Sequence, residues 1–342
     1  MVVSKTFPDK IWETLSPQEA GFKPEGLAAA ETWLKDNANG EPYRIVIARH
    51  GRLVAEWQQG ISQGKKVKLA SATKSVYSNM LGIIVEEGKL ESPDVKLKDV
   101  YPIALEVPEG SGPKEGRYVF DKDHDITLRQ LISNTSGYMK PSEEPGQVYN
   151  YQTFGMNVLI HALSQPYGLY DPNDPERKPG FEQLIETRIG QKIGADWEYA
   201  YYNFPLPDSV RLDIFGYFCN VVSTARDMAR LGWLWANYGN WNGEQVIPES
   251  WMRESVKVAP TILEHCPKED WQYGYGFWTN SEGVYNPNLP RNYFSARGAG
   301  KQYIAVVPSL ELVVVLSPGL WLGGVKSDPP LLELICEACQ RA

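Results

Sequence analysis

The chain has 342 residues, of which 42% are hydrophobic and 22% charged, and its formal net charge is −8. These values are typical of a globular protein that can bury a core without disulfide or metal staples. An acidic chain argues against a nucleic-acid partner, which would require a basic face. No apolar run approaches the ~18 residues of a membrane span, so we expect no such span.

The start of the chain, from Met1 to Lys10, contains no apolar stretch of the kind found in signal peptides. The sequence therefore predicts a cytoplasmic protein, unless an export sequence has been removed from this end. At roughly 100–200 residues per domain, the length allows one large or two moderate domains.

Strand signals gather toward the two ends of the chain. Near the start, Arg44–Arg49 and Leu53–Trp57 are β-rich runs joined by a short glycine-containing turn, which is typical of a hairpin. Four further runs lie in the last third, before a helical pattern over Pro330–Arg341: Tyr273–Trp278, Tyr293–Arg297, Gln302–Val307 and Leu312–Leu316. We expect one antiparallel sheet built from residues 1–90 and 265–342.

Helical patterns dominate the part of the chain between these strands. Segments with helical apolar spacing or capping signals are Ser71–Gly88, Thr127–Ile132, Phe154–Ser164 and Thr224–Tyr238. Loops rich in Pro, Gly, Asp and Asn separate them, namely Glu106–Gly116, Lys140–Gly146 and Tyr167–Gly180. We therefore predict an α+β fold: an antiparallel sheet flanked by helices, with a mainly helical region, residues 91–264, inserted.

The sequence predicts neither a metal site nor a bound cofactor. Cys336-Glu-Ala-Cys339 is a lone cysteine pair, whereas a structural zinc site needs four ligands. The acidic stretch Asp121–Asp125 fits a solvated loop before a helix better than a set of metal ligands. The chain has no glycine-rich phosphate-binding motif and no Gly-x-Ser-x-Gly of the α/β-hydrolases.

One nucleophile motif remains, Ser71-Ala-Thr-Lys74. A Ser-x-x-Lys pattern alone is weak, and Ser62-Gln-Gly-Lys65 matches it too. That second match contains a glycine and continues into further lysines, so it indicates an exposed turn. Ser71 instead follows Leu69-Ala70 and opens the apolar helix. This context favours a catalytic role for Ser71. The alternative is that Ser71 caps the helix and Lys74 lies on the surface.

The spacing suits a serine nucleophile with a lysine base. On a helix, residues i and i+3 share a face, so Lys74 can reach the hydroxyl of Ser71. A serine hydroxyl needs a base to take its proton, and burial against an apolar helix favours the neutral lysine that can do this. The helix N-terminus also places the backbone N–H of Ser71 where an oxyanion can use it.

Several stretches in the same order resemble the serine β-lactamase-like hydrolases, over about residues 10–320. This family includes class C β-lactamases, D-Ala-D-Ala carboxypeptidases, family VIII-type esterases and 6-aminohexanoate-dimer hydrolases. The matching stretches are Leu69–Ser75, Ile126–Gly137, Pro145-Gly146 with Tyr151, Ser223–Gly232 with Tyr238–Gly243, and Gly300–Leu316. The resemblance implies a β-lactamase/transpeptidase-like fold.

By this resemblance, Ser71 is the acylated nucleophile, Lys74 is its base partner and Tyr151 is the tyrosine of the family's Tyr-x-Asn motif. In the family that phenol helps to move the proton between serine, lysine and leaving group. Tyr149 is the competing candidate, and the distance from Pro145-Gly146 favours Tyr151.

Two departures from the family pattern concern substrate binding. In β-lactamases the asparagine of the second motif binds the substrate amide. Its place is taken by Thr153, which we therefore expect to be a substrate-binding residue. The Lys-Thr-Gly of β-lactamases is missing near Tyr293–Ser295. Arg297 could substitute as the cation that binds a substrate carboxylate. The backbone N–H of Ala296 would be the second oxyanion donor, within a register error of one or two residues.

These observations predict a cofactor-independent serine hydrolase that cleaves ester or amide bonds of small substrates through an acyl-enzyme. Because the second and third motifs are altered, a carboxylesterase or small amidase is favoured. Alternatives are a D-amino-acid peptidase, a weak β-lactamase, an acyltransferase, or a penicillin-binding sensor that acylates without turnover.

Overall fold

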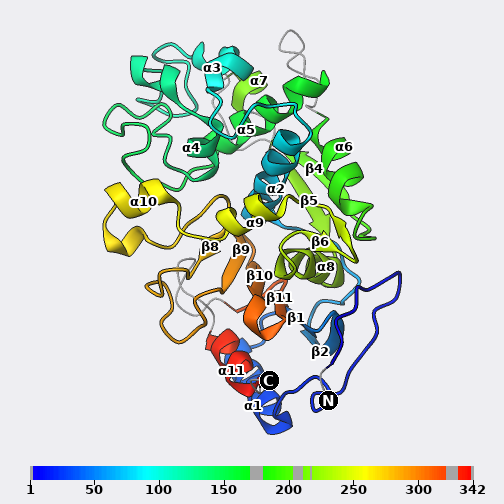
Figure 1. The fold of residues 1–342 in the computed structure, drawn as a ribbon. Helices are drawn as coiled ribbons and strands as arrows, with labels where there is room; N and C mark the ends of the chain where they lie inside the picture. The colour runs from blue at the N-terminus through cyan, green and yellow to red at the C-terminus, as the bar shows by residue number, and fades with distance from the viewer. Residues whose placement is uncertain (1–2, 170–179, 203–210, 216–217, 321–329, 340–342) are drawn as a thin grey trace.

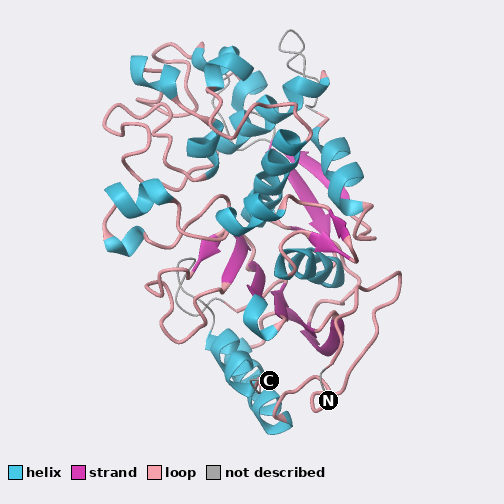
Figure 2. Cartoon of the chain, in the orientation of Figure 1, coloured by secondary structure: helices cyan, strands magenta, loops and turns pink. Residues whose placement is uncertain are grey.

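The computed structural model describes residues 3–169, 180–202, 211–215, 218–320 and 330–339 (Figure 1). Parts of two predicted segments lie outside the described residues: 170–179 of the loop Tyr167–Gly180, and the end of the helix Pro330–Arg341. The central sheet lies in the lower half of the view in Figure 2, and many of the helices gather above it. No helix within the described residues is long and apolar enough to cross a membrane.

Six antiparallel strands form the central sheet, in the order β2-β1-β11-β10-β9-β8. Their bounds are β1 Tyr43–Arg49, β2 Arg52–Gln59, β8 Trp278–Thr279, β9 Phe294–Gly298, β10 Gln302–Val307 and β11 Leu312–Leu316. The first strand pairs with the last, with Ile47 opposite Val314. The predicted α+β fold with an antiparallel sheet from both chain ends is confirmed.

Helices cover both faces of this sheet. In β1, Ile47 packs on the face covered by α1 and α11, and its neighbour Val46 packs on the face covered by α2 and α8. These helices are α1 Pro24–Ala38, α2 Thr73–Glu86, α8 Ala225–Ala236 and α11 Pro330–Ala338. Since both faces are buried, every residue of β1, β10 and β11 is buried.

The remaining elements form two small sheets and most of the helices that gather above the central sheet, which we call the helical half. The helices are α3 Leu97–Val100, α4 Leu128–Ile132, α5 Phe154–Ser164, α6 Phe181–Ile185, α7 Leu212–Phe215, α9 Glu249–Ser255 and α10 Pro260–His265. The small sheets are β3 Val67–Lys68 with β5 Phe218–Ser223 and β4 Glu198–Tyr202, and β6 Asn240–Trp241 with β7 Glu244–Gln245.

Two predicted helix starts have the expected capping geometry. The Thr127 hydroxyl accepts from the Gln130 N–H, and the Gln130 side chain accepts from the Thr127 N–H, which is a complete capping box. Thr224 caps α8 by accepting from the Asp227 N–H at 3.1 Å. Polar side chains therefore define these helix ends locally, as the sequence indicated.

The structure differs from the sequence prediction in its short strands. Of the predicted run Tyr273–Trp278 only Trp278 is in a strand, because Gly276 adopts φ +80°, which a regular strand does not allow. The sheet β3-β5-β4 lies partly within the region predicted to be mainly helical. It was missed because β3 and β5 are far apart in the sequence and pairing over that distance leaves little local signal.

The division into residues 1–90 with 265–342 and residues 91–264 remains a prediction. The helix α8 belongs to the second segment in sequence, yet it packs against β1, β10 and β11 of the central sheet. The inserted segment therefore contributes one of the layers that cover the sheet.

We expect Thr224→Ala to lower the free energy of unfolding by about 1 kcal/mol, because the cap of α8 is lost. Urea unfolding would measure this change. Thr224→Ser, which keeps a hydroxyl acceptor, should lie much closer to the wild type. Equal destabilisation by both substitutions would contradict the role of this hydroxyl as a cap.

Candidate active site

Ser71 lies where the chain leaves β3 and enters the central helix α2. A single 3-10 turn, Ala70–Ala72, precedes α2, and Ser71 is its half-buried middle residue. The N-cap position of α2 is Ala72, without a side-chain cap. Ser71 therefore does not cap the helix, which argues against the structural alternative for this motif.

The Lys74 side chain joins the predicted residues. It is 1% exposed, so it is not a surface residue. Its Nζ donates to Ser71 Oγ at 3.0 Å, to Tyr151 OH at 2.7 Å and to Thr153 Oγ1 at 3.3 Å. These three hydroxyls supply the polar partners that a buried lysine nitrogen needs. The structure thus brings Ser71, Lys74, Tyr151 and Thr153 together.

Aromatic rings hold Tyr151 in place. The Trp278 ring stacks on it with a centroid distance of 5.7 Å and an interplanar angle of 28°, and Tyr273 meets it edge-on at 5.9 Å. The competing Tyr149 packs its ring against Tyr273, and burial raises the pKa of the Tyr149 phenol well above its ordinary value. The hydrogen bond to Lys74 distinguishes Tyr151 from Tyr149.

Asn134, which the sequence analysis did not single out, supports the backbone on either side of Tyr151. Its carbonyl accepts from the Asn150 N–H and its side-chain oxygen accepts from the Gln152 N–H, both at 2.9 Å. Asn134 has φ +59°, a conformation that asparagine tolerates better than most residues. The sequence signal that could have identified Asn134 is its position between α4 and Gly137, within one of the stretches that resemble the family.

The end of β9 lies directly against the turn that carries Ser71. A Cβ atom added at Gly298 would lie 1.9 Å from the carbonyl oxygen of Leu69 and 2.9 Å from the Ala72 nitrogen. Only a residue without a side chain allows this approach. The backbone of β9 therefore forms one wall beside Ser71.

The strand register bears on the predicted oxyanion donor Ala296. The Tyr293 carbonyl accepts from the Asn280 N–H, so the polar groups of Tyr293 point toward the β8 side of β9. Consecutive residues of a strand direct these groups to opposite sides. The Ala296 N–H is therefore directed toward β10, where Ala296 pairs with Ile304. This register does not favour Ala296 as the oxyanion donor. It directs the N–H of the next residue, Arg297, toward the β8 side.

Arg297, predicted as a substrate-binding cation, points away from Ser71. It is 3% exposed, and its Nη2 lies 3.2 Å from Tyr303 OH, on the sheet face opposite that of Ala296. Its side chain also donates to the Ser295 and Tyr285 hydroxyls. The guanidinium carbon lies 5.2 Å from the centroid of the Trp278 ring. Arg297 therefore supports Trp278 behind Tyr151, because alternation along β9 turns it to that face.

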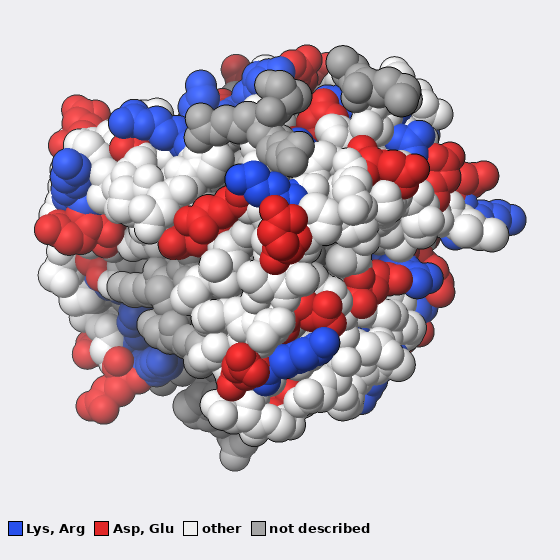
Figure 3. Space-filling model, turned by 90° about the horizontal axis from the view of Figure 1, so that it is seen from below, with Lys and Arg blue, Asp and Glu red and all other residues white. Residues whose placement is uncertain are grey.

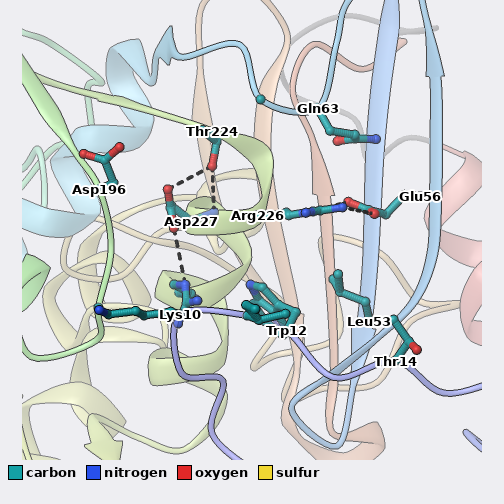
Figure 4. Close-up of a pocket in the computed structure, with 14 residues that line it drawn as sticks. Lys10, Trp12, Thr14, Leu53, Glu56, Gln63, Asp196, Thr224, Arg226 and Asp227 are labelled. Atoms are coloured by element: carbon teal, nitrogen blue, oxygen red, sulfur yellow. Dashed lines mark hydrogen bonds and ion pairs between the residues drawn. The ribbon is translucent and has the colours of Figure 1, made fainter.

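A cavity of about 730 Å³ lies elsewhere, between the N-terminal segment, β2 and the start of α8 (Figure 4). Its charged side chains largely pair with one another: Arg226 with Glu56, and Arg230 with Asp227. Acidic and basic side chains also lie interspersed on the face shown in Figure 3. None of the residues around Ser71 lines this cavity, so we do not assign the chemistry to it.

The described residues contain no group of three or more His, Cys, Asp and Glu side chains that could hold a metal ion. Within the acidic stretch, Asp123 is fully buried and its carboxylate accepts from the backbone N–H groups of Phe120 and Met139 and from Lys122. Asp123 therefore organises a turn.

The family model described as Beta-lactamase matches residues 43–318. "Beta-lactamase-like protein 1" of Dictyostelium discoideum is 34% identical over 111 residues, which cover 30% of this chain and 17% of that protein. A family VIII carboxylesterase superposes with a TM-score of 0.64 at 16% identity, covering 92% of this chain and 96% of its own. A penicillin-binding protein homolog from Caulobacter crescentus gives 0.62 at 16% identity, covering 93% and 98%.

The hydrolase EstCE1, described as having promiscuous acyltransferase activity, is also similar in fold. It superposes with a TM-score of 0.64 at 15% identity and covers 92% of this chain and 98% of its own. At these identities the superpositions show a shared fold.

We expect Gly298→Ala to lower the free energy of unfolding by about 1–3 kcal/mol, because the new methyl group would force β9 away from the turn at Leu69. Urea unfolding would measure the change. Gly64→Ala is the matched control, since a Cβ atom there would meet nothing within 4 Å. An unchanged stability of Gly298→Ala would contradict the close approach.

Proposed function

Because the chain belongs to the Beta-lactamase family, a family of hydrolases, we propose that it is a serine hydrolase cleaving ester or amide bonds of small substrates. The observation that carries this proposal is the position of Lys74 Nζ, within hydrogen-bond distance of both Ser71 Oγ and Tyr151 OH. A nucleophile and a base in contact, with a second proton carrier beside them, are what acyl transfer requires.

In the proposed reaction, Ser71 Oγ attacks the substrate carbonyl and its proton passes to the Lys74–Tyr151 pair. Collapse of the tetrahedral intermediate breaks the bond to the leaving group, which takes up that proton and departs. Water then attacks the acyl-Ser71 ester and gives its proton to the same pair. The pair returns this proton to Ser71 Oγ as the acyl–oxygen bond breaks and the acid departs. Positioned general acids and bases of this kind contribute about 10²–10⁴-fold to the rate.

The oxyanion would be held by the backbone N–H groups of Ser71 and Ala299. We move the second donor from Ala296 to Ala299 because the Ala296 N–H is directed toward β10. Gly298 lies against the Ser71 turn, which supports its successor Ala299 as the second donor. One such donor is typically worth about 2.7–4 kcal/mol in the transition state.

The substrate preference we propose is carboxylesterase-like. Thr153 stands where the β-lactamase motif has asparagine, and its hydroxyl accepts from Lys74, so it supports the base. Arg297 is engaged by Ser295 and Tyr303 on the other sheet face, so it does not offer a charge to a β-lactam carboxylate. The fold shared with a family VIII carboxylesterase and with EstCE1 is consistent with this preference. A D-amino-acid peptidase, a weak β-lactamase or a penicillin-binding sensor is the alternative.

We expect Ser71→Ala to abolish turnover of an activated acetyl ester that the wild type hydrolyses. Product release and intact-protein mass would be followed in the same tubes, and in parallel with benzylpenicillin. A persistent benzylpenicillin adduct on wild-type Ser71 would favour the peptidase or sensor. Undiminished ester turnover by Ser71→Ala would show that the site is elsewhere.

We expect Tyr151→Phe to lower kcat by about 10²–10⁴-fold, because the phenol that carries the proton is lost. Tyr149→Phe is the matched control, since Tyr149 packs on the same Tyr273 ring and is the competing candidate. Steady-state hydrolysis of the same ester would compare them. A larger loss in Tyr149→Phe than in Tyr151→Phe would reverse the assignment.

A further inference from the structure

The residues that lead to Ser71 form an antiparallel ladder with β5, and its last backbone hydrogen bond is made at Leu69. Val67 pairs with Ser223 and Lys68 with Val222, and the Leu69 N–H donates to the Val221 carbonyl at 2.9 Å. By the same register, Ala70 lies opposite Asn220 on β5.

At Ala70 the backbone N–H bonds to a side chain of β5. The Ala70 N–H donates to Asn220 Oδ1 at 2.9 Å, and Asn220 is fully buried. Ala70 has φ +50°, in the left-handed region that disfavours residues with a Cβ. The hydrogen bond fixes the peptide plane before Ala70, and so it compensates for a backbone conformation that alanine does not prefer.

The conformation of Ala70 decides how the next residue is presented. The peptide planes on the two sides of Ala70 set the direction of the Ser71 N–H and of the Ser71 side chain. We propose that Asn220 is a positioning residue for Ser71: its side-chain oxygen holds Ala70 in the left-handed conformation that aims Ser71 Oγ at Lys74. This inference rests on the proposed role of Ser71 as nucleophile.

The other end of the same amide supports this assignment. Asn220 Nδ2 is buried and has no hydrogen-bond partner among the described residues. A buried donor without a partner destabilises the fold, so an apolar residue would fit better if only packing mattered. The single bond to Ala70 is therefore the interaction that the asparagine supplies.

The test compares Asn220→Ala with Asn157→Ala in hydrolysis of the activated acetyl ester. Asn157 is the matched control, because it is also fully buried, donates to the Phe215 carbonyl and leaves its Oδ1 without a partner among the described residues. We expect Asn220→Ala to lower kcat by about 10–100-fold with little change in KM, since misplacing a reacting group has effects of this size. Asn157→Ala should lower the melting temperature but leave kcat near the wild-type value.

A double-mutant cycle with Ala70→Gly distinguishes positioning from a purely structural role. It measures whether the loss of kcat caused by Asn220→Ala depends on the residue at position 70. Glycine adopts the left-handed conformation readily, so the loss caused by Asn220→Ala should shrink about tenfold in the Ala70→Gly background. If Asn220→Ala does not fold, Asn220→Thr replaces it in both measurements. Threonine suits a strand, and its hydroxyl is too short to take the place of the asparagine oxygen.

Equal losses of kcat in Asn220→Ala and Asn157→Ala would overturn the inference. The same Asn220→Ala loss in both backgrounds at position 70 would also overturn it. The Ser71→Ala variant separates this failure from failure of the proposed function. Inactive Ser71→Ala with fully active Asn220→Ala would remove only the positioning role. Active Ser71→Ala would remove the proposed nucleophile and the positioning role together.

Discussion

A lysine amine that is 1% exposed must find its hydrogen-bond partners inside the protein, because a buried polar group without partners is costly. At Lys74 those partners are the hydroxyls of Ser71, Tyr151 and Thr153. They come from two segments, the start of α2 and the loop before α5. Satisfying one buried amine therefore ties the helical half of the molecule to the entry of the central helix, and it places a nucleophile and a proton carrier in contact.

The surrounding structure holds these groups from several directions. Trp278 stacks on Tyr151 from the edge of the central sheet, and Asn134 supports the backbone on either side of that tyrosine. Gly298 lets β9 approach the Ser71 turn from the sheet side. Each support comes from a different element, so the geometry around Ser71 depends on the packing of the whole chain.

Sequence patterns predicted most of this fold and part of the site. The sheet from both chain ends, the central helix and the capped starts at Thr127 and Thr224 all carried local signals. Thr153, predicted to bind substrate in the place of the motif's asparagine, also accepts a hydrogen bond from Lys74. Ala296 and Arg297 were placed by counting residues. Alternation along β9 directs the Ala296 N–H toward β10 and the Arg297 side chain to the face opposite Ala296. A one-residue difference in register reverses such an assignment.

The sequence by itself determined the fold class and the spacing of Ser71 and Lys74 on one helix face, because periodicity, caps and i,i+3 neighbours are local properties of a chain. The resemblance of several stretches in the same order indicated the family. Motif spacing favoured Tyr151 over Tyr149, but only the tertiary structure brings the Tyr151 phenol to Lys74 and Asn220 to Ala70. Those contacts join residues 77 and 150 positions apart. Their geometry depends on how helices and strands pack, which no local pattern records.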